Sequence, residues 1–169
     1  DFGECRAFAV ADHQVAHVYV RDSADIKPVK KLLEKTPGID RVLDAEGLKE
    51  FHLGHARAGE LVAISAPDKW FTYYYWQDDK CAPPFARTVD IHNKPGYDPA
   101  ELFLDPQKSK AGLITRVMMK KAGLSVQIEA IALNGDQVKG SHGRLTDSSL
   151  DGPVFISSTK AGLPPASSR

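Results

Sequence analysis

One loop of the sequence places an imidazole where it could reach a metal ion or a phosphate group. Residues 140–143 read Gly-Ser-His-Gly and precede an apolar run at residues 153–157. Glycine has no Cβ, so the backbone on both sides of His142 can pass close to a ligand. Imidazole is a common ligand of zinc and related metals. His142 could therefore bind a metal ion or a phosphate, and the alternative is a turn histidine exposed to water.

A second pair of suitable side chains is Asp12-His13, which follows an apolar run at residues 6–11. In α/β proteins, ligands usually bind just beyond the ends of the strands. The carboxylate and the imidazole would lie together at such an end. Alternatively, the strand continues past His13, and its period of two puts His13, His17 and Tyr19 on one face. The pair is therefore a secondary metal-binding candidate.

A third group of polar residues lies in the long, proline-containing stretch at residues 77–106. Asp90 and His92 could reach a cleft together, with Tyr97 close behind. Long loops in compact domains are often functional, although their polar residues are commonly just solvated. His92 and Tyr97 are our candidates for substrate binding.

The elements that must position these residues alternate between strand and helix patterns over the first 65 residues. Such alternation predicts an α/β or α+β unit. Residues 6–20 fit either one buried strand or two strands broken near Asp12-His13. Apolar spacing and the capping residues Asp22 and Ser23 predict a helix that begins with Pro28 in its first turn. The further predictions here are strands at 39–43 and 60–65 and helices at 26–35 and 45–51.

The rest of the chain carries weaker patterns. Residues 70–76 concentrate aromatic side chains and predict a strand with rings on alternate faces. We also predict a helix at 111–122 and strands at 126–131 and 153–157. An aromatic wall at 70–76 leaves open a second function class, a non-catalytic α+β binding module that uses this surface for contact.

Composition excludes several function classes. The 169 residues carry 22 basic and 22 acidic side chains, so no net charge attracts nucleic-acid polymers or anionic lipid. No apolar stretch approaches the roughly 20 residues that span a bilayer, so we expect no membrane insertion. Motifs of dinucleotide oxidoreductases, P-loop NTPases, α/β-hydrolases and zincins are missing. Cys5 and Cys81 have no metal or redox spacing, which favours free thiols and a cytoplasmic location.

Several segments together resemble the C-terminal half of the type I phosphodiesterase/nucleotide pyrophosphatase family, within the alkaline phosphatase superfamily. The resemblance runs from about residue 4 to 158 and implies an α/β fold, as a fragment of an alkaline phosphatase-like sandwich with a cap insert. Residues 1–160 would form this single fragment, with about 22–130 an α+β, cap-like and peripheral part. Residues 161–169 would be a flexible tail. The segments that carry the resemblance are 7–20, 58–63, 70–76, 90–99 and 140–145.

The resemblance also implies a mechanism. Members hold two divalent metal ions, usually zinc, and a Thr or Ser nucleophile attacks phosphorus to form a covalent intermediate. Substrates would be small phosphodiesters or nucleotide-like molecules. The family's late zinc-binding histidine, in a Ser/Thr-His-Gly setting, falls on His142.

The family's Asp-His pair precedes Gly-Met and could be aligned with Asp12-His13. Gln14 replaces that glycine here, so we expect the family's pair to lie upstream and Asp12-His13 to border the cleft. The nucleophile and the first metal carboxylates would also precede Asp1, where the chain has no initiator Met. We therefore expect a fragment that needs the remainder of the parent chain and is inactive alone.

Overall fold

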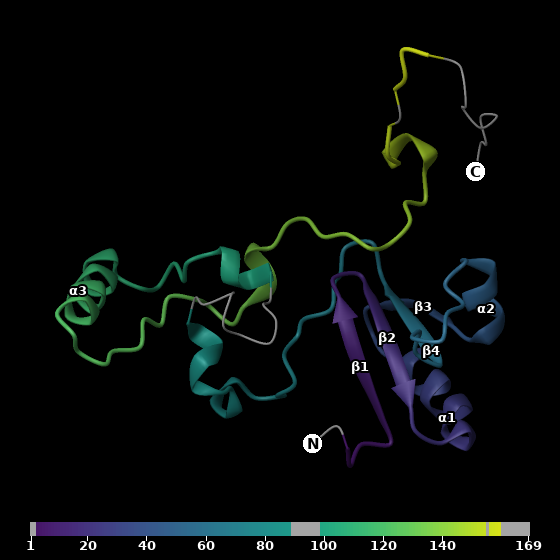
Figure 1. Ribbon diagram of the computed structural model, residues 1–169, viewed down its shortest axis with the longest axis horizontal. Coiled ribbons are helices and arrows are strands. Elements are labelled where there is room, and N and C mark those ends of the chain that lie inside the picture. Colours follow the sequence, from purple (N-terminus) through teal and green to yellow (C-terminus); the bar gives the residue numbers. More distant parts are fainter. Residues whose placement is uncertain (1–2, 89–98, 155, 160–169) are drawn as a thin grey trace.

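The first part of the chain forms a four-stranded sheet. The structure is a computed structural model that describes residues 3–88, 99–154 and 156–159. The strands β1 (Ala7–Asp12), β2 (Val15–Val20), β3 (Ile39–Leu43) and β4 (Leu61–Ser65) are arranged in the order β1-β2-β4-β3 (Figure 1). All neighbouring strands are antiparallel. The predicted mixture of helix and sheet is confirmed, and of the two alternatives for residues 6–20, the two-strand form is observed.

Helices α1 (Ser23–Leu33) and α2 (Ala45–Glu50) each follow an aspartate N-cap, of which the sequence analysis names Asp22 but not Asp44. The Asp22 carboxylate accepts a hydrogen bond from the Ala24 N–H, and Asp44 does the same for Glu46 and Gly47. These side chains satisfy N–H groups that have no partner inside the helix. Helix α1 begins at Ser23 rather than at residue 26, so Pro28 lies in its interior and not in its first turn as the sequence predicts.

The two helices cover opposite faces of the sheet. Ile26, Val29 and Leu33 of α1 pack against a buried cluster that contains Leu61. Leu48 of α2 packs in a second cluster that contains Val62. Adjacent residues of a strand point to opposite faces, so Leu61 and Val62 belong to two core layers, one on each face of the sheet. This explains why all five residues of β4 are buried.

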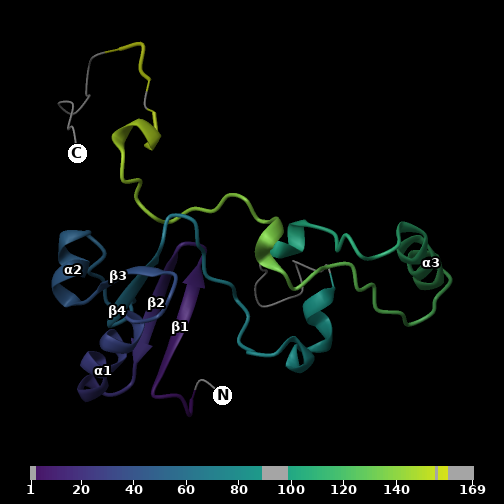
Figure 2. The same cartoon turned by 180° about the vertical axis from the view of Figure 1, so that it is seen from behind.

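Helix α3 and the segments next to it extend away from this sheet (Figures 1 and 2). Helix α3 (Lys110–Lys121), which the sequence predicts at 111–122, has no buried residue. None of the described helices is long and apolar enough to cross a membrane. Three short 3-10 helices of the described residues lie between β4 and α3, namely η1 (Asp79–Cys81), η2 (Pro84–Arg87) and η3 (Pro99–Leu102). Two more follow α3, η4 (Gly135–Gln137) and η5 (Ser149–Asp151).

Three predicted strands are wrong. Residues 70–76 form bends and irregular backbone, and residues 126–131 form two isolated bridges, Thr88 with Glu129 and Leu104 with Ile131. In the segment 153–157, Val154 is 83% exposed and Ile156 is 87% exposed. Each pattern has suitable residues, but the described part of the chain offers no neighbouring strand to pair with them. The predicted tail at 161–169 lies outside the described residues.

Candidate metal centre

Asp12 and His13 lie at the tip of the hairpin formed by β1 and β2. Asp12 pairs with Val15, so His13 and Gln14 form a two-residue loop. His13 has a φ of 56°, in the left-handed region that such loops require and that histidine tolerates better than most residues. The alternative of a strand that continues through His13 is therefore wrong.

His142 reaches this hairpin tip from a distant part of the sequence. The Gln14 N–H donates a hydrogen bond of 2.9 Å to the His142 carbonyl. The centroids of the His13 and His142 rings are 4.1 Å apart, and their planes are inclined by 39°. In Figure 1 the segment that carries His142 crosses beside the turn between β1 and β2.

The donor atoms of Asp12, His13 and His142 all lie within 4.8 Å of one another. Two ligands of one zinc ion are at most about 4.2 Å apart, because each bond is about 2.1 Å long. The observed limit is slightly wider and also suits ligands divided between two ions about 3.5–4 Å apart. The spacing therefore fits a metal centre after small side-chain adjustments.

Two further observations agree with this fit. Nδ1 of His13 is buried and has no hydrogen-bond partner, although such groups are nearly always paired. Asp12 and His142 are exposed, so the cluster is open to solvent on one side. A carboxylate and two imidazoles form a donor set that suits zinc.

Arg144 attaches the His142 segment to the sheet. Its guanidinium donates to Asp40 Oδ2 at 2.6 Å, to the Ser65 carbonyl at 3.2 Å, and to both oxygens of Asp147 at 2.9 and 3.0 Å. The hydrogen bonds to Asp40 and Asp147 raise the pKa of Arg144 above its ordinary value. Arg144 therefore stays charged and paired beside the cluster.

Gln14 makes a second attachment. Its side-chain Nε2 donates to the carbonyls of Pro67 and Lys69 at 3.3 and 3.1 Å, and its own carbonyl accepts from the Ser65 N–H at 3.0 Å. In the sequence, Gln14 is a departure from the family pattern, and Arg144 is not among the candidate residues. A signal for Arg144 was available in the acidic residue three positions later, Asp147.

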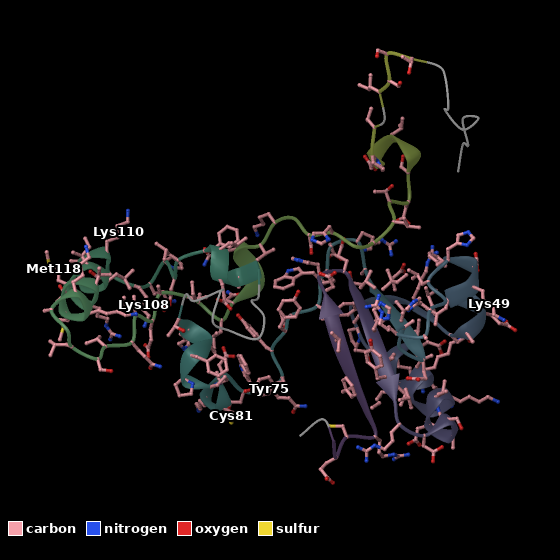
Figure 3. All side chains as sticks on the ribbon, viewed as in Figure 1. Lys49, Tyr75, Cys81, Lys108, Lys110 and Met118 are labelled. Atoms are coloured by element: carbon pink, nitrogen blue, oxygen red, sulfur yellow. The ribbon has the colours of Figure 1, made fainter. Side chains whose placement is uncertain are left out.

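The other candidates have different outcomes. His92 and Tyr97, the candidates for substrate binding, lie outside the described residues. In the aromatic segment 70–76, Tyr74 and Trp76 stack with ring centroids 4.6 Å apart, and Tyr75 meets Trp76 edge-on at 5.2 Å. These rings therefore pack on one another, although Tyr75 remains exposed (Figure 3).

Residues 3–98 match the type I phosphodiesterase / nucleotide pyrophosphatase family, which is more than half of the chain. The chain belongs to this family of hydrolases, so the resemblance expected from the sequence is confirmed. Family members depend in general on metal ions. Asp12 and His13 lie inside the matched range, whereas His142 lies beyond it.

Among solved structures, the chain is similar to the phosphonoacetate hydrolase of Sinorhizobium meliloti 1021, determined in complex with phosphonoacetate. The two are 25% identical, with a TM-score of 0.36. The match covers 40% of this chain and 20% of that hydrolase, so the chain spans a small part of its relative. No curated protein matches the chain.

Proposed function

We propose that this chain contributes Asp12, His13 and His142 to the metal centre of a phosphodiesterase or nucleotide pyrophosphatase. The observation that carries the proposal is the convergence of three donor atoms within 4.8 Å, from two segments far apart in the sequence. Membership of the hydrolase family supports the same reading. Substrates would be small phosphodiesters or nucleotide-like molecules.

The proposed centre holds two divalent ions, and zinc is the best match to the donor set. When bound, such ions supply a nucleophile of lowered pKa and stabilise the leaving oxygen. Three donors are too few for two ions. The proposal therefore assigns the other ligands and the Thr or Ser nucleophile to the remainder of the parent chain.

In this proposal the residues of the chain hold the metal ions and orient them for the substrate. His13 and His142 offer ring nitrogens, and Asp12 offers a carboxylate that offsets the positive charge of the metal ions. The exposed side of the cluster gives a phosphate ester access to the centre. His92 and Tyr97 remain candidates for contact with the organic part of the substrate.

Metal binding tests the proposal directly. The purified 169-residue chain is titrated with zinc and with manganese, by calorimetry and by competition with a chelator. We expect His142→Ala to weaken zinc binding by at least about 100-fold, because even loss of a residue that merely supports a ligand costs 10–100-fold. His52→Asn is the control. It removes an exposed imidazole far from the cluster in sequence, and asparagine tolerates the left-handed backbone conformation of this position. This variant should bind zinc like wild type.

Turnover tests the assignment of the nucleophile to another part of the enzyme. With zinc present, the chain alone should not hydrolyse a nitrophenyl phosphodiester. Turnover that His142→Ala abolishes would show that the chain carries its own nucleophile. A chain that binds neither zinc nor manganese, and is unaffected by His142→Ala, would instead favour the aromatic binding module.

A further inference from the structure

The segment that carries His142 has few attachments to the sheet. Within residues 139–147, all of which are described, Ser141 and Arg144 are the residues that are not exposed. The Arg144 side chain is only 10% exposed. Arg144 therefore anchors a segment whose other residues, apart from Ser141, are exposed.

Arg144 binds acceptors on three separate segments. Asp40 belongs to β3, the Ser65 carbonyl ends β4, and Asp147 follows in the same segment as Arg144. A guanidinium is planar and presents several N–H groups in a fixed fork, so these acceptors determine its orientation. A flexible ammonium group would not be fixed in the same way.

The sheet is shaped to present one of these acceptors. Ile39 pairs with Ser65 and Arg41 with Ile64, which leaves Asp40 as an extra residue in β3. A β-bulge of this kind redirects a side chain out of the regular pattern. The redirected Asp40 carboxylate meets Arg144 at 2.6 Å.

The same part of the sheet holds the other candidate ligands. Ser65 accepts from Arg144 through its carbonyl and donates through its N–H to Gln14. Gln14 follows His13 directly and donates to the His142 carbonyl. Ser65 thus connects both sides of the cluster through two hydrogen bonds of a single buried residue.

We infer that Arg144 is a positioning residue, which holds His142 against Asp12 and His13 by fixing its segment to Asp40 and Ser65. This inference rests on the proposed function, because it assigns His142 to the metal centre. Arg144 is not one of the three clustered donors, and its guanidinium binds Asp40, Ser65 and Asp147 instead. Its effect on metal affinity must therefore pass through His142.

A double-mutant cycle tests this dependence, because coupled residues give non-additive effects. Zinc affinity is measured for wild type, Arg144→Met, His142→Ala and the double variant. We expect Arg144→Met to weaken binding by about 10–100-fold. It should cause almost no further loss once His142 is alanine. An equal loss in both backgrounds, or no loss in either, would overturn the inference.

Two matched variants separate positioning from general loss of charge. Arg41→Met removes the neighbouring arginine, whose Nε lies 3.6 Å from the same Asp40, and should leave zinc affinity unchanged. Arg144→Lys keeps the charge but not the fork, and should give an affinity between wild type and Arg144→Met. Weaker zinc binding by Arg41→Met would instead indicate an effect of overall charge.

A measurement without metal distinguishes failure of this inference from failure of the proposed function. The ring centroids of His13 and His142 are 4.1 Å apart, close enough for a nuclear Overhauser effect between imidazole protons. We expect this signal in wild type and Arg41→Met and its loss in Arg144→Met, with the resonances of β2 and β4 unchanged. Its persistence in Arg144→Met contradicts the positioning role, whether or not zinc binds. If the nuclear Overhauser effects follow the expected pattern but the chain binds no zinc, the metal centre is refuted and the positioning role of Arg144 stands.

Discussion

Gly143 is the residue whose missing side chain lets the His142 segment approach the hairpin. Its φ is 109°, and an added Cβ would lie 3.1 Å from Val15 Cγ2 and 3.4 Å from the Asp12 carbonyl oxygen. Both the backbone conformation and the close approach disfavour any other residue.

We expect Gly143→Ala to release the segment from the turn. A strained backbone conformation of this kind costs about 1–3 kcal/mol, which corresponds to roughly a 5- to 150-fold change in a local equilibrium. The Gln14 amide, which donates to His142, should exchange its hydrogen faster by that factor. Gly140→Ala is the control, because nothing lies within 4 Å of its added Cβ. Unchanged protection of Gln14 in Gly143→Ala would contradict this account.

Asp44 makes stability depend on pH. The hydrogen bond from Lys30 and the N–H of Gly47 lower the pKa of Asp44 below its ordinary value. A carboxyl group whose pKa is lowered by folding stabilises the native state above its unfolded pKa of about 4. That stabilisation is lost as pH falls below about 4 and through the folded pKa.

Urea unfolding of wild type and Asp44→Asn between pH 7 and pH 2.5 measures this effect. Asparagine still caps α2 but carries no charge. Wild type should be the more stable protein at pH 7, by less than about 1 kcal/mol because the pair is partly exposed. This advantage should disappear at low pH, and an advantage that grows on acidification would contradict the assignment.

At the scale of residues, the sequence predicts His142 as a ligand and Asp12-His13 as a secondary candidate, but it does not predict that the three side chains meet. The reason is local. Two-residue hairpin loops are usually recognised from Asn-Gly or Asp-Gly, and His13-Gln14 carries neither signal. The side-chain bonds of Gln14 to Pro67 and Lys69 depend on a loop more than 50 residues away, which no local pattern reveals.

At the scale of elements, the first 65 residues were predictable because their signals are local. Asp22 and Asp44 mark the starts of α1 and α2, and alternation or apolar runs mark the strands. The strands predicted at 70–76, 126–131 and 153–157 failed because a strand also needs a partner to pair with. Composition identifies residues that suit a sheet, but it does not identify their neighbours.

β4 is the element on which both core layers depend. Leu61 is completely buried between β2 and α1. Leu61→Ala should destabilise the sheet by about 2–5 kcal/mol, as measured by urea unfolding with far-ultraviolet circular dichroism. Leu150→Ala, at a residue that is 93% exposed, should change stability by less than about 0.5 kcal/mol. Similar effects of the two variants would contradict the assigned core.

The whole molecule combines a packed sheet with an extended remainder. Figure 3 shows the side chains of α3, including Lys110 and Met118, far from those of the sheet. A helix of 12 residues is marginal in water unless packing supports it, and α3 buries none of its residues.

Hydrogen exchange should therefore divide the chain. Amides of β2 and β4 should be protected to the level of global unfolding, whereas those of α3 should exchange nearly as fast as in an unfolded chain. Mass spectrometry or NMR of the purified chain provides the measurement. Protection of α3 comparable with that of β4 would show that the helix is packed in solution.

The separation of His142 from the hairpin in sequence sets the order of events during synthesis. All four strands of the described part of the chain lie between Ala7 and Ser65, so the sheet can form from relatively short-range contacts while the ribosome is still adding later residues. The hydrogen bond between Gln14 and His142 closes a far longer loop, and His142 leaves the ribosome well after the sheet residues. The sheet is thus a template that exists before the third candidate ligand arrives.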